Sequence, residues 1–494
     1  MRCRHHPACP GCPLIELPYE VQLAEKRARL GAALARYGHL PPAPPVQAAI
    51  RTEGYRHRLK LPMHVERDHV AIGLLHPRSG RVVDTPDCPV LHPKLRAALA
   101  PLLERLKGKH GLHSLDLRVS SDTGEVQAVF ACAGGELPGG KHFARKLIEA
   151  VPGLSSVAVS QADPERKRVM GRAPRVLAGS ATLSERIGAT QYSILPGVFF
   201  QVDPQNAETL HAWVREGLGS AGRVLDLYAG VGAYARMLAR DRQRVVAVEE
   251  VPAAAEAARR GAPPNLTVIA GRAEDVLLEE RFDAAVINPA RRGSDPALLR
   301  RLAERVPRLV YVSCGPETLA RDLDCLAAWG LRVQSVRAVD LFPQTPEVEA
   351  VVTLTRGPAL TSWPVRGGEA TGPWRGRPSG ALGRPERLLA LVIGDPGPQG
   401  KLPGGSFTRL AVVATHGLVR VSLHGAPGPA LEALAKRGHP LAWEDRKTRR
   451  FFEERIGLVR PFLHVERAGG VVAPLHGDLA TVLETLGVRS VGAS

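Results

Sequence analysis

The chain has 494 residues, enough for two to four domains, and its composition is that of a globular protein, with 44% hydrophobic and 23% charged residues. No apolar run approaches the roughly 20 residues of a membrane-spanning helix, and the first residues lack the apolar core of a secretory signal, so we expect a cytoplasmic protein with no membrane partner. The 66 Lys and Arg residues exceed the 49 Asp and Glu residues by 17, which favours a polyanionic partner, with a compositional bias toward Arg and Ala as the alternative explanation.

Four cysteines stand out by their spacing. Cys3, Cys9 and Cys12 lie in one turn-rich segment at the start of the chain, and Cys88 is followed by proline, as Cys9 and Cys12 are. Four thiolates brought together by the fold could ligate an iron–sulfur cluster or a structural zinc ion, and the spacing does not choose between them. Unligated, reduced thiols are the alternative. Cys132 and Cys325 have no evident partners in the sequence, and we expect them to be ordinary buried thiols.

The first part of the chain is predicted to be a helix followed by a strand-rich domain. From Leu14 to about Tyr37, apolar residues three and four apart indicate a helix, and a proline-rich stretch ends it, so residues 1–48 form the first expected unit. Short β-branched stretches separated by turns predict a compact domain over residues 49–195. Its strand Tyr55-Arg-His-Arg-Leu-Lys carries basic residues on one face, which could meet phosphates or simply face solvent.

The pattern changes near residue 200 to alternating strands and helices, which predicts a doubly wound α/β sheet over residues 196–356. Gly230 and Gly232 lie in a turn between a strand and a helix, where the backbone can close around a ligand. Glu249 follows Gly230 by nineteen residues and ends the next strand, where a carboxylate can accept hydrogen bonds from ribose hydroxyls. The turn and the acid together favour a nucleoside-containing cofactor over a purely structural turn.

Cys314 is the candidate nucleophile. The apolar run Leu309-Val-Tyr-Val-Ser ends at this cysteine, and a helical pattern begins near Pro316. A thiol at the carboxyl end of a buried parallel strand lies where open α/β sheets bind their ligands. Farther along, Glu349 stands at the beginning of a last strand. The chain contains nothing that resembles a phosphate-binding loop or a Ser-His-Asp triad.

Several blocks in this order resemble the 5-methyluridine RNA methyltransferases that use S-adenosylmethionine. The matching blocks are Phe199-Phe-Gln-Val-Asp, Leu225-Asp-Leu-Tyr-Ala-Gly-Val-Gly, Val248-Glu, Asn288-Pro-Ala-Arg-Arg-Gly, Ser313-Cys-Gly-Pro-Glu-Thr-Leu-Ala-Arg-Asp and Phe342-Pro-Gln-Thr-Pro-Glu-Val-Glu. The resemblance extends over roughly residues 1–356 and implies a Rossmann-like class I methyltransferase domain.

The resemblance also implies roles for particular residues. Cys314 would add to carbon 6 of uracil, Glu349 would remove the proton from carbon 5, and Gln201, Tyr228, Gly230, Gly232, Glu249 and Asn288 would hold S-adenosylmethionine. The four spaced cysteines match the ligands of a [4Fe-4S] cluster in the ribosomal RNA branch. That branch, the absence of a preceding RNA-binding barrel, and Asn288 with its double arginine indicate a 23S ribosomal RNA loop as the substrate, with a transfer RNA uridine as the alternative. We expect a monomer.

The chain departs from the family pattern at Ala229, Ala233 and Gly315, where a cysteine, a small polar residue or glycine, and an asparagine are usual. These changes leave a catalytically inactive RNA-binding or ribosome-assembly factor as an alternative. Residues 357–385 are rich in Gly, Pro and Arg and predict a linker. Residues 386–494 resemble the later half of a large-ribosomal-type pseudouridine synthase but lack the segment with the catalytic aspartate, so we expect a small α+β appendage without a second active site.

Overall fold

The structure is a computed structural model that describes most of the chain. The described residues are 1–37, 39–163, 169–171, 174–276, 280–357, 385–393, 395–403, 405–413, 416–423, 433–439, 463–468 and 471–472. The described α-helices are α1 (Tyr19–Ala35), α2 (Pro93–Leu106), α3 (Gly140–Ala150), α4 (Pro204–Leu218), α5 (Ala233–Leu238), α6 (Pro252–Arg259), α7 (Pro296–Arg305) and α8 (Pro316–Ala328). None of these helices is long and apolar enough to cross a membrane.

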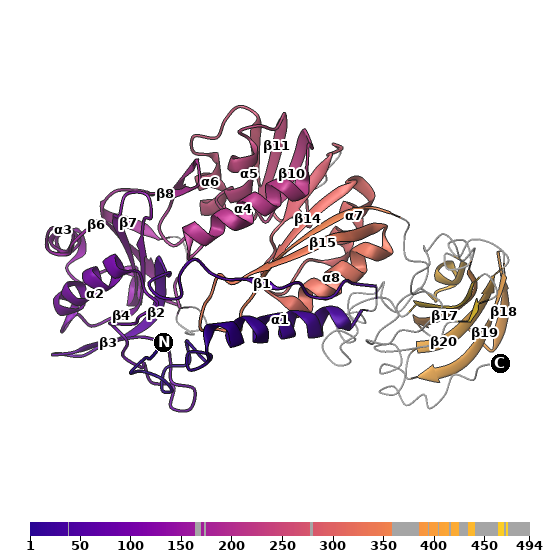
Figure 1. Cartoon of the computed structure of the whole chain (residues 1–494), viewed down its shortest axis with the longest axis horizontal. Coiled ribbons are helices and arrows are strands. Elements are labelled where there is room, and N and C mark those ends of the chain that lie inside the picture. Colours follow the sequence, from indigo (N-terminus) through magenta and orange to yellow (C-terminus); the bar gives the residue numbers. More distant parts are fainter. Residues whose placement is uncertain are drawn as a thin grey trace.

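The largest sheet has eight strands in the order β1-β15-β16-β14-β13-β10-β11-β12 (Figure 1). Its strands are β1 (Val46–Gln47), β10 (Arg223–Leu227), β11 (Arg244–Glu249), β12 (Leu266–Ala270), β13 (Ala284–Ile287), β14 (Arg308–Ser313), β15 (Leu331–Val339) and β16 (Glu349–Arg356). Strands β10 to β14 run parallel, whereas β16 is antiparallel to both of its neighbours, β14 and β15. This confirms the predicted α/β sheet in the second half of the chain.

Both faces of this sheet are covered by helices, which explains why its central strands are mostly apolar. Successive side chains of β10 point to opposite faces, as the strand period requires. Leu225 and Leu227 pack in a core that includes residues of α1, α7 and α8, while Val224 packs on the other face with residues of α4 and α5. A strand buried on both faces reads as a continuous hydrophobic run, the pattern that marked these strands in the sequence.

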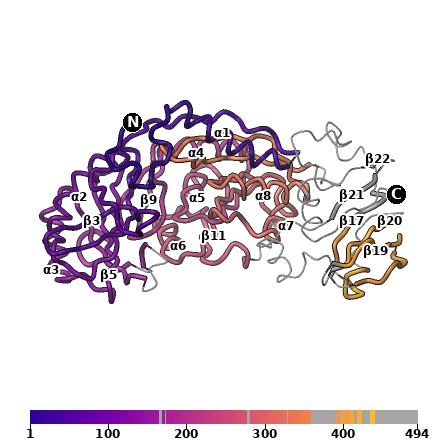
Figure 2. The backbone as a smooth tube through the Cα atoms, turned by 90° about the horizontal axis from the view of Figure 1, so that it is seen from below, coloured from indigo at the N-terminus to yellow at the C-terminus, as the bar shows by residue number. Residues whose placement is uncertain are grey.

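The N-terminal segment adds a helix and a strand to this sheet. Leu30 and Leu34 of α1 lie in the same core as the sheet residues, and β1 pairs in parallel with β15. In Figures 1 and 2 the indigo helix α1 accordingly lies beside the orange strands near the end of the α/β region. The predicted helix was expected from Leu14; it begins at Tyr19, because Pro18 precedes it and residues 14–17 form a turn.

A buried ion pair fixes α1 to the sheet. The Lys26 ammonium lies 2.5 Å from the Asp340 carboxylate, and both side chains are fully buried. Lys26 also donates to the Phe342 carbonyl oxygen over 3.0 Å. The predicted apolar stripe is present, since Leu30, Ala33 and Leu34 are buried, and the structure adds a charged residue to the same interface.

Replacing Lys26 by Met is expected to lower the free energy of unfolding by about 3–5 kcal/mol, because it leaves the Asp340 carboxylate buried without its cation. Urea unfolding of the whole chain, followed by the fluorescence of its tryptophans, would measure the change. The double variant Lys26→Met, Asp340→Leu is the matched control and is expected to recover a large part of the loss. An unfolding midpoint of Lys26→Met equal to that of the wild type would contradict the prediction.

The strand-rich region forms a second, six-stranded sheet in the order β3-β2-β4-β5-β6-β7, and a hairpin, β8–β9, follows it. These strands are β2 (Arg58–Val65), β3 (Val70–Ile72), β4 (Leu112–Val119), β5 (Val126–Cys132), β6 (Leu154–Gln161), β7 (Arg175–Gly179), β8 (Leu183–Ile187) and β9 (Thr190–Ile194). Helices α2 and α3 pack in its core. The sequence predicted the strands and missed both helices.

Beyond residue 357 the described residues include a third sheet, in the order β18-β19-β20-β17-β21-β22. Its strands are β17 (Pro385–Ile393), β18 (Gln399–Leu402), β19 (Gly405–Val413), β20 (His416–Leu423), β21 (Leu463–Ala468) and β22 (Val471–Val472). The expected strands near residues 388, 407 and 417 fall in β17, β19 and β20. Residues 358–384, which make up nearly all of the expected linker, lie outside the described residues, and so does much of the expected appendage.

Candidate functional site

The predicted site residues gather at one edge of the large sheet. Tyr228, Asn288 and Cys314 directly follow the parallel strands β10, β13 and β14, and Glu249 is the last residue of β11. Because the carboxyl ends of parallel strands meet at one edge, these residues lie at the edge where such sheets bind their ligands. Glu349 lies at the same edge, because β16 runs antiparallel to β14 and Glu349 is its first residue.

The glycine turn after β10 has the backbone conformation that its residues suggested. Gly230 and Gly232 have φ values of 59° and 75°, and Tyr228 has the left-handed value of 59°, which is uncommon for a residue with a side chain. The Gly230 N–H donates to Glu249 Oε2 over 2.8 Å, and the Val251 N–H donates to Oε1 of the same carboxylate over 2.8 Å. The turn and the acid predicted to cooperate are therefore in direct contact.

These residues fit a nucleoside-containing cofactor. The Glu249 carboxylate uses one lone pair of each oxygen for a backbone N–H, and each oxygen keeps a lone pair that can accept from a ribose hydroxyl. Asn288 lies beside Tyr228, because Leu227 and Ile287 are paired in the sheet and each of the two residues comes next in its strand. Ala229, the first departure from the family pattern, is buried in the core, and an alanine fits there without a polar partner.

Two acids near the turn were not predicted from the sequence. The Tyr228 hydroxyl donates to Glu274 Oε1 over 3.0 Å. Asp226, fully buried within β10, accepts from the Ala235 N–H at the start of α5 over 2.9 Å, and burial raises the pKa of its carboxyl to about 8. Asp226 lies between two leucines in a strand that is buried on both faces, so the sequence alone could have identified it as a buried acid.

Cys314 and Glu349 are neighbours across two paired strands. Ser313 at the end of β14 pairs with Ala350 of β16, so the next residue of one strand lies against the preceding residue of the other. Burial raises the pKa of the Cys314 thiol, and the Glu349 carboxylate raises it further, whereas Arg291 lowers it. Burial raises the pKa of Glu349 to about 8, again opposed by Arg291. The predicted nucleophile and base therefore interact, and both are mostly protonated at neutral pH.

Arg291 and Glu347 complete this part of the site and were not among the predicted site residues. Arg291 Nη1 lies 3.0 Å from Glu347 Oε1, so the loop after β13 is joined to the loop before β16. Both residues stand inside the quoted motifs, Asn288-Pro-Ala-Arg-Arg-Gly and Phe342-Pro-Gln-Thr-Pro-Glu-Val-Glu, which was the available signal. Their pairing joins residues that are 56 positions apart in the chain.

Close packing explains why a glycine fits at position 315. A Cβ atom built there would lie 2.8 Å from Thr318 Oγ1 and 3.2 Å from the Arg291 carbonyl oxygen. Thr318 Oγ1 donates to that carbonyl oxygen over 2.9 Å, so the Arg291 loop rests directly on the turn after Cys314. The absence of a side chain at Gly315 therefore lets the two loops pack closely.

Gln201 lies at the junction of the two larger sheets. Its neighbour Val202 accepts from the His57 N–H over 2.7 Å, and Asp203 caps α4 by accepting from the Asn206 N–H. Gln201 is half-buried, and within the described part of the chain its side chain has no hydrogen bond to another predicted site residue.

The four spaced cysteines approach one another in the fold. Burial raises the pKa of the Cys12 thiol to about 12, and the thiols of Cys88, Cys9 and Cys3 raise it further. The segment with Cys3 to Cys12 is joined to the loop of Cys88 through Asp87, which lies 2.6 Å from the His5 ring and 2.9 Å from Arg4. All four thiols are free. Across the described residues, no three His, Cys, Asp or Glu side chains are arranged to hold one metal ion.

Comparisons with known proteins agree with the geometry of the sheet edge. Residues 270–357, which include Asn288, Cys314 and Glu349, match a family model described as tRNA (Uracil-5-)-methyltransferase. An uncharacterized RNA methyltransferase of Geobacter sulfurreducens is 33% identical over 380 residues, which cover 72% of this chain and 77% of the relative. One of Gloeobacter violaceus is 34% identical over 369 residues, which cover 70% of this chain and 81% of the relative.

A solved structure is similar over the same region. The Pyrococcus abyssi tRNA (uracil-54, C5)-methyltransferase in complex with S-adenosyl-L-homocysteine aligns with a TM-score of 0.59 and 28% identity. The alignment covers 71% of this chain and 86% of that structure.

Proposed function

This chain belongs to the RNA uracil-5-methyltransferase family, and we propose that it methylates carbon 5 of a loop uridine in 23S ribosomal RNA. The observation that carries the proposal is the position of Cys314 beside Glu349 at the carboxyl edge of the sheet, next to a glycine turn suited to a nucleoside. A nucleophile adjacent to a base is the arrangement that covalent methylation of a pyrimidine requires. We propose that the reaction takes place in the cytoplasm.

S-adenosylmethionine, when bound, supplies an electrophilic methyl group. In our proposal Glu249 would accept hydrogen bonds from its ribose hydroxyls, and the turn from Tyr228 to Gly232 would help to hold it. Asn288 and Gln201 would complete the contacts to the cofactor, with either of them also able to reach the uracil edge. The support for these assignments is the contact between Glu249 and the turn.

In the proposed mechanism the Cys314 thiolate attacks carbon 6 of uracil, and the electrons of the 5,6 double bond move toward the carbon 4 carbonyl to form an enolate. Carbon 5 would then accept the methyl group that S-adenosylmethionine supplies. Glu349 removes the remaining proton from carbon 5, the double bond re-forms, and the bond between carbon 6 and Cys314 breaks. The buried carboxyl of Glu349 suits this role because burial makes its carboxylate a stronger base.

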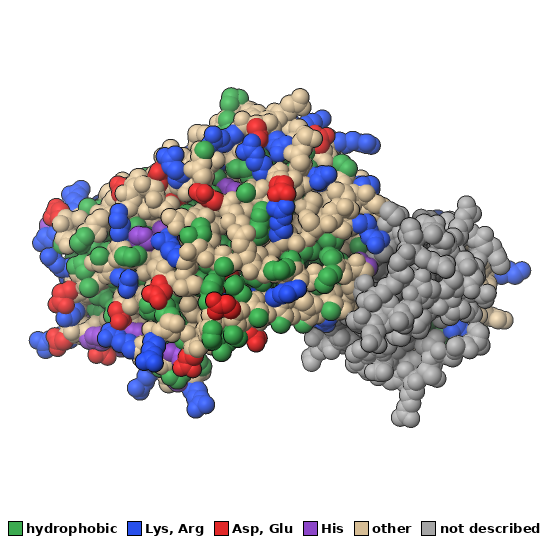
Figure 3. Space-filling view, in the orientation of Figure 1, with side chains coloured by type: hydrophobic (Ala, Val, Ile, Leu, Met, Phe, Trp, Pro, Cys, Tyr) green, Lys and Arg blue, Asp and Glu red, His purple; other side chains and the backbone are tan. Residues whose placement is uncertain are grey.

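The RNA must present its base outside a helical stack. A uracil stacked in a duplex cannot place carbon 6 against a half-buried thiol at a sheet edge, so a loop or bulge is favoured. On the face shown in Figure 3, Lys and Arg side chains are interspersed with Asp and Glu side chains, and no continuous basic patch marks an RNA path. The net charge of +17 is consistent with attraction of RNA to the whole surface.

A uridine of transfer RNA is the second candidate substrate, and the Pyrococcus abyssi tRNA (uracil-54, C5)-methyltransferase favours it. The test is nucleoside mass spectrometry of purified 23S ribosomal RNA and transfer RNA from the wild type and from a Cys314→Ala strain. We expect one 5-methyluridine to disappear from 23S ribosomal RNA. Its disappearance from transfer RNA would assign the alternative substrate, and unchanged nucleosides in both pools would favour an RNA-binding or assembly factor without activity.

Methylation is expected to accelerate as the pH rises from about 7 to 9. The pKa of Cys314 is raised, and that of Glu349 is raised to about 8, so each group is mostly protonated at pH 7 and gains its reactive, ionised form at higher pH. Single-turnover rates measured with saturating RNA and cofactor would give the profile. A rate that is constant over this range, or that falls with pH, would contradict the assigned roles.

We further propose that Cys3, Cys9, Cys12 and Cys88 hold a [4Fe-4S] cluster. Their mutual electrostatic effects support this ligand set, and in a cluster each thiolate binds a different iron. A single zinc ion instead needs four ligands at roughly 2.0–2.3 Å from one centre. The cluster would supply structural support, since methyl transfer requires no electrons.

The cluster proposal predicts bound iron. Protein purified without oxygen is expected to contain about four iron and four sulfide ions per chain, and Cys12→Ser is expected to lose most of both. Cys314→Ser is the matched control and should keep the wild-type iron content. Metal analysis would decide the matter, because zinc in place of iron, or no metal in anaerobic wild-type protein, would refute the cluster.

A further inference from the structure

Helix α1 carries a row of three polar side chains on the face that it turns toward the sheet. Gln22, Lys26 and Arg29 are four and three residues apart, so they lie on one side of the helix. Gln22 is 1% exposed and Lys26 is fully buried. Buried polar groups need partners, because an unpaired one loses its hydrogen bonds to water without replacement. We call Gln22, Lys26 and Arg29 the polar row of α1.

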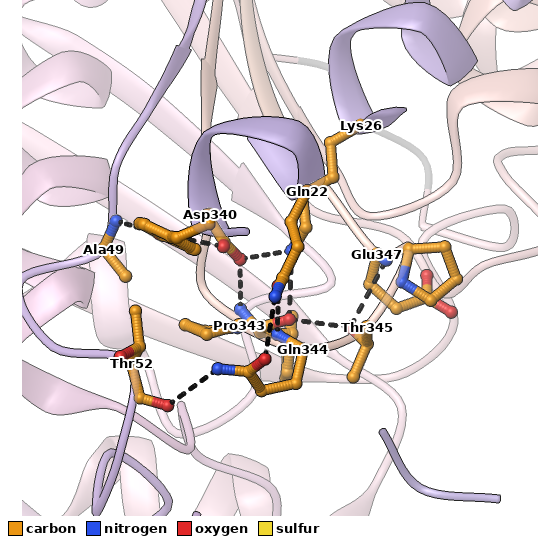
Figure 4. Close-up of polar contacts among 12 residues, drawn as sticks. Gln22, Lys26, Ala49, Thr52, Asp340, Pro343, Gln344, Thr345 and Glu347 are labelled. Atoms are coloured by element: carbon orange, nitrogen blue, oxygen red, sulfur yellow. Dashed lines mark hydrogen bonds and ion pairs between the residues drawn. The ribbon is translucent and has the colours of Figure 1, made fainter. Parts of the chain in front are cut away.

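Each residue of the polar row has a partner in one loop, residues 340–348, which leads directly into Glu349. Figure 4 shows the contacts that Gln22 and Lys26 make with this loop. Gln22 Nε2 donates to Gln344 Oε1 over 2.8 Å, and the Gln344 N–H donates to Gln22 Oε1 over 2.9 Å. Gln344 has a φ of 71°, a conformation that a residue with a side chain rarely adopts. The reciprocal pair of hydrogen bonds therefore holds the loop in a shape it would not prefer alone.

Lys26 holds the beginning of the same loop. Besides its ion pair with Asp340, it donates to the Phe342 carbonyl oxygen over 3.0 Å, and Asp340 accepts from the Phe342 N–H over 2.9 Å. The Tyr19 hydroxyl, also on α1, donates to the second oxygen of Asp340 over 3.0 Å. The turn at residues 340–342 is thus closed around a lysine that comes from the other end of the sequence.

Arg29 touches both sides of the proposed reaction centre. Its guanidinium donates to the two oxygens of Glu317 over 3.3 Å each, and Glu317 lies three residues after Cys314. It also donates to the Pro346 carbonyl oxygen over 3.1 Å and lies 3.5 Å from Glu347, two residues before Glu349. One side chain therefore joins the turn that follows the nucleophile to the loop that precedes the base.

We propose that Arg29 is a positioning residue, which sets the location of Glu349 relative to Cys314, and that the polar row of α1 supports it. This inference rests on the proposed function. Proton removal depends steeply on placement, since an error of about 1 Å can cost a factor of 100 in rate. Arg29 suits the task because its planar fork makes a two-pronged contact with Glu317 and keeps a further N–H for Pro346.

The experiment compares Arg29→Gln, Arg29→Lys and Glu25→Gln, whose side chain lies exposed on the same helix. Methylation of ordinary RNA requires proton removal by Glu349. Covalent adduct formation on RNA with 5-fluorouridine does not require it, because the fluorine replaces that proton. Comparing the two rates therefore isolates the step that Glu349 performs, and melting temperatures identify any variant that is simply unfolded.

For Arg29→Gln we expect kcat to fall about 10-fold or more, with KM values for RNA and cofactor within about 2-fold of the wild type. Adduct formation on 5-fluorouridine RNA should fall much less than kcat, and the kinetic isotope effect of 5-deuterated uridine should rise. Arg29→Lys should recover part of the loss, and Glu25→Gln should match the wild type.

Equal losses of kcat and of adduct formation in Arg29→Gln would overturn the inference, and so would activity equal to that of Glu25→Gln. Wild-type protein that methylates neither RNA would instead refute the proposed function itself. The two failures are therefore distinguishable.

Discussion

Glu349→Gln is expected to stop the enzyme after methyl transfer, with the RNA still attached to Cys314. The adduct cannot collapse while carbon 5 keeps its proton, and an amide cannot accept that proton. General-base catalysis commonly contributes 10²–10⁴-fold, so turnover should fall by about 10³-fold or more. Labelled RNA that migrates with the protein through a denaturing gel would reveal the adduct, and mass spectrometry would locate it on Cys314.

The fold should survive this change. Burial raises the pKa of Glu349 to about 8, so the wild-type side chain is mostly a neutral carboxyl at pH 7, and glutamine has nearly the same shape without a charge. Glu304→Gln, an exposed change on α7, is the control and should turn over normally without a persistent adduct. Fast turnover by Glu349→Gln would assign the base to another residue.

Cys314→Ala is expected to abolish both the adduct and methylation. Carbon 5 of uracil is a poor nucleophile until a group adds to carbon 6, so loss of the thiol should lower the rate by at least about 10⁴-fold. Transfer of a radioactive methyl group to RNA measures this directly.

Binding of S-adenosylhomocysteine, measured by calorimetry, is the control for Cys314→Ala. It should remain close to that of the wild type, because the glycine turn and Glu249 belong to other strands than Cys314. Methylation that persists in this variant would exclude the covalent mechanism.

Much of the site could be predicted because its residues follow apolar strands in a fixed order. Topology brings the carboxyl ends of parallel strands together, so Glu249 and Cys314 could be placed at one edge of the sheet from strand order, and the resemblance to a family added Asn288. Glu349 could not be placed in this way, because the apolar residues of β16 do not show whether the strand runs parallel or antiparallel to its neighbours. Its assignment to the site came from the resemblance to a family.

The parts that could not be predicted depend on contacts between distant segments. Lys26 looks like an ordinary surface residue of an amphipathic helix, and only its partner, more than three hundred residues away, makes its burial possible. The pairing of Arg291 with Glu347 has the same character. Helices α2 and α3 were missed for a different reason: their apolar residues lie between strands and were interpreted as part of a strand-rich pattern.

The position of β16 between β14 and β15 has a consequence for how the protein is made. Strand β15 is synthesised first, yet it reaches the rest of the parallel sheet only through β16. A nascent chain that ends at β15 therefore has Cys314 and the glycine turn but lacks the proposed base, Glu349, and an unbroken sheet. Strand β16 is the last strand of this sheet to be synthesised, and it completes the hydrogen-bonded sheet and delivers Glu349 in the same event. Under the proposed mechanism, the ability to release RNA therefore arises only when this sheet is complete.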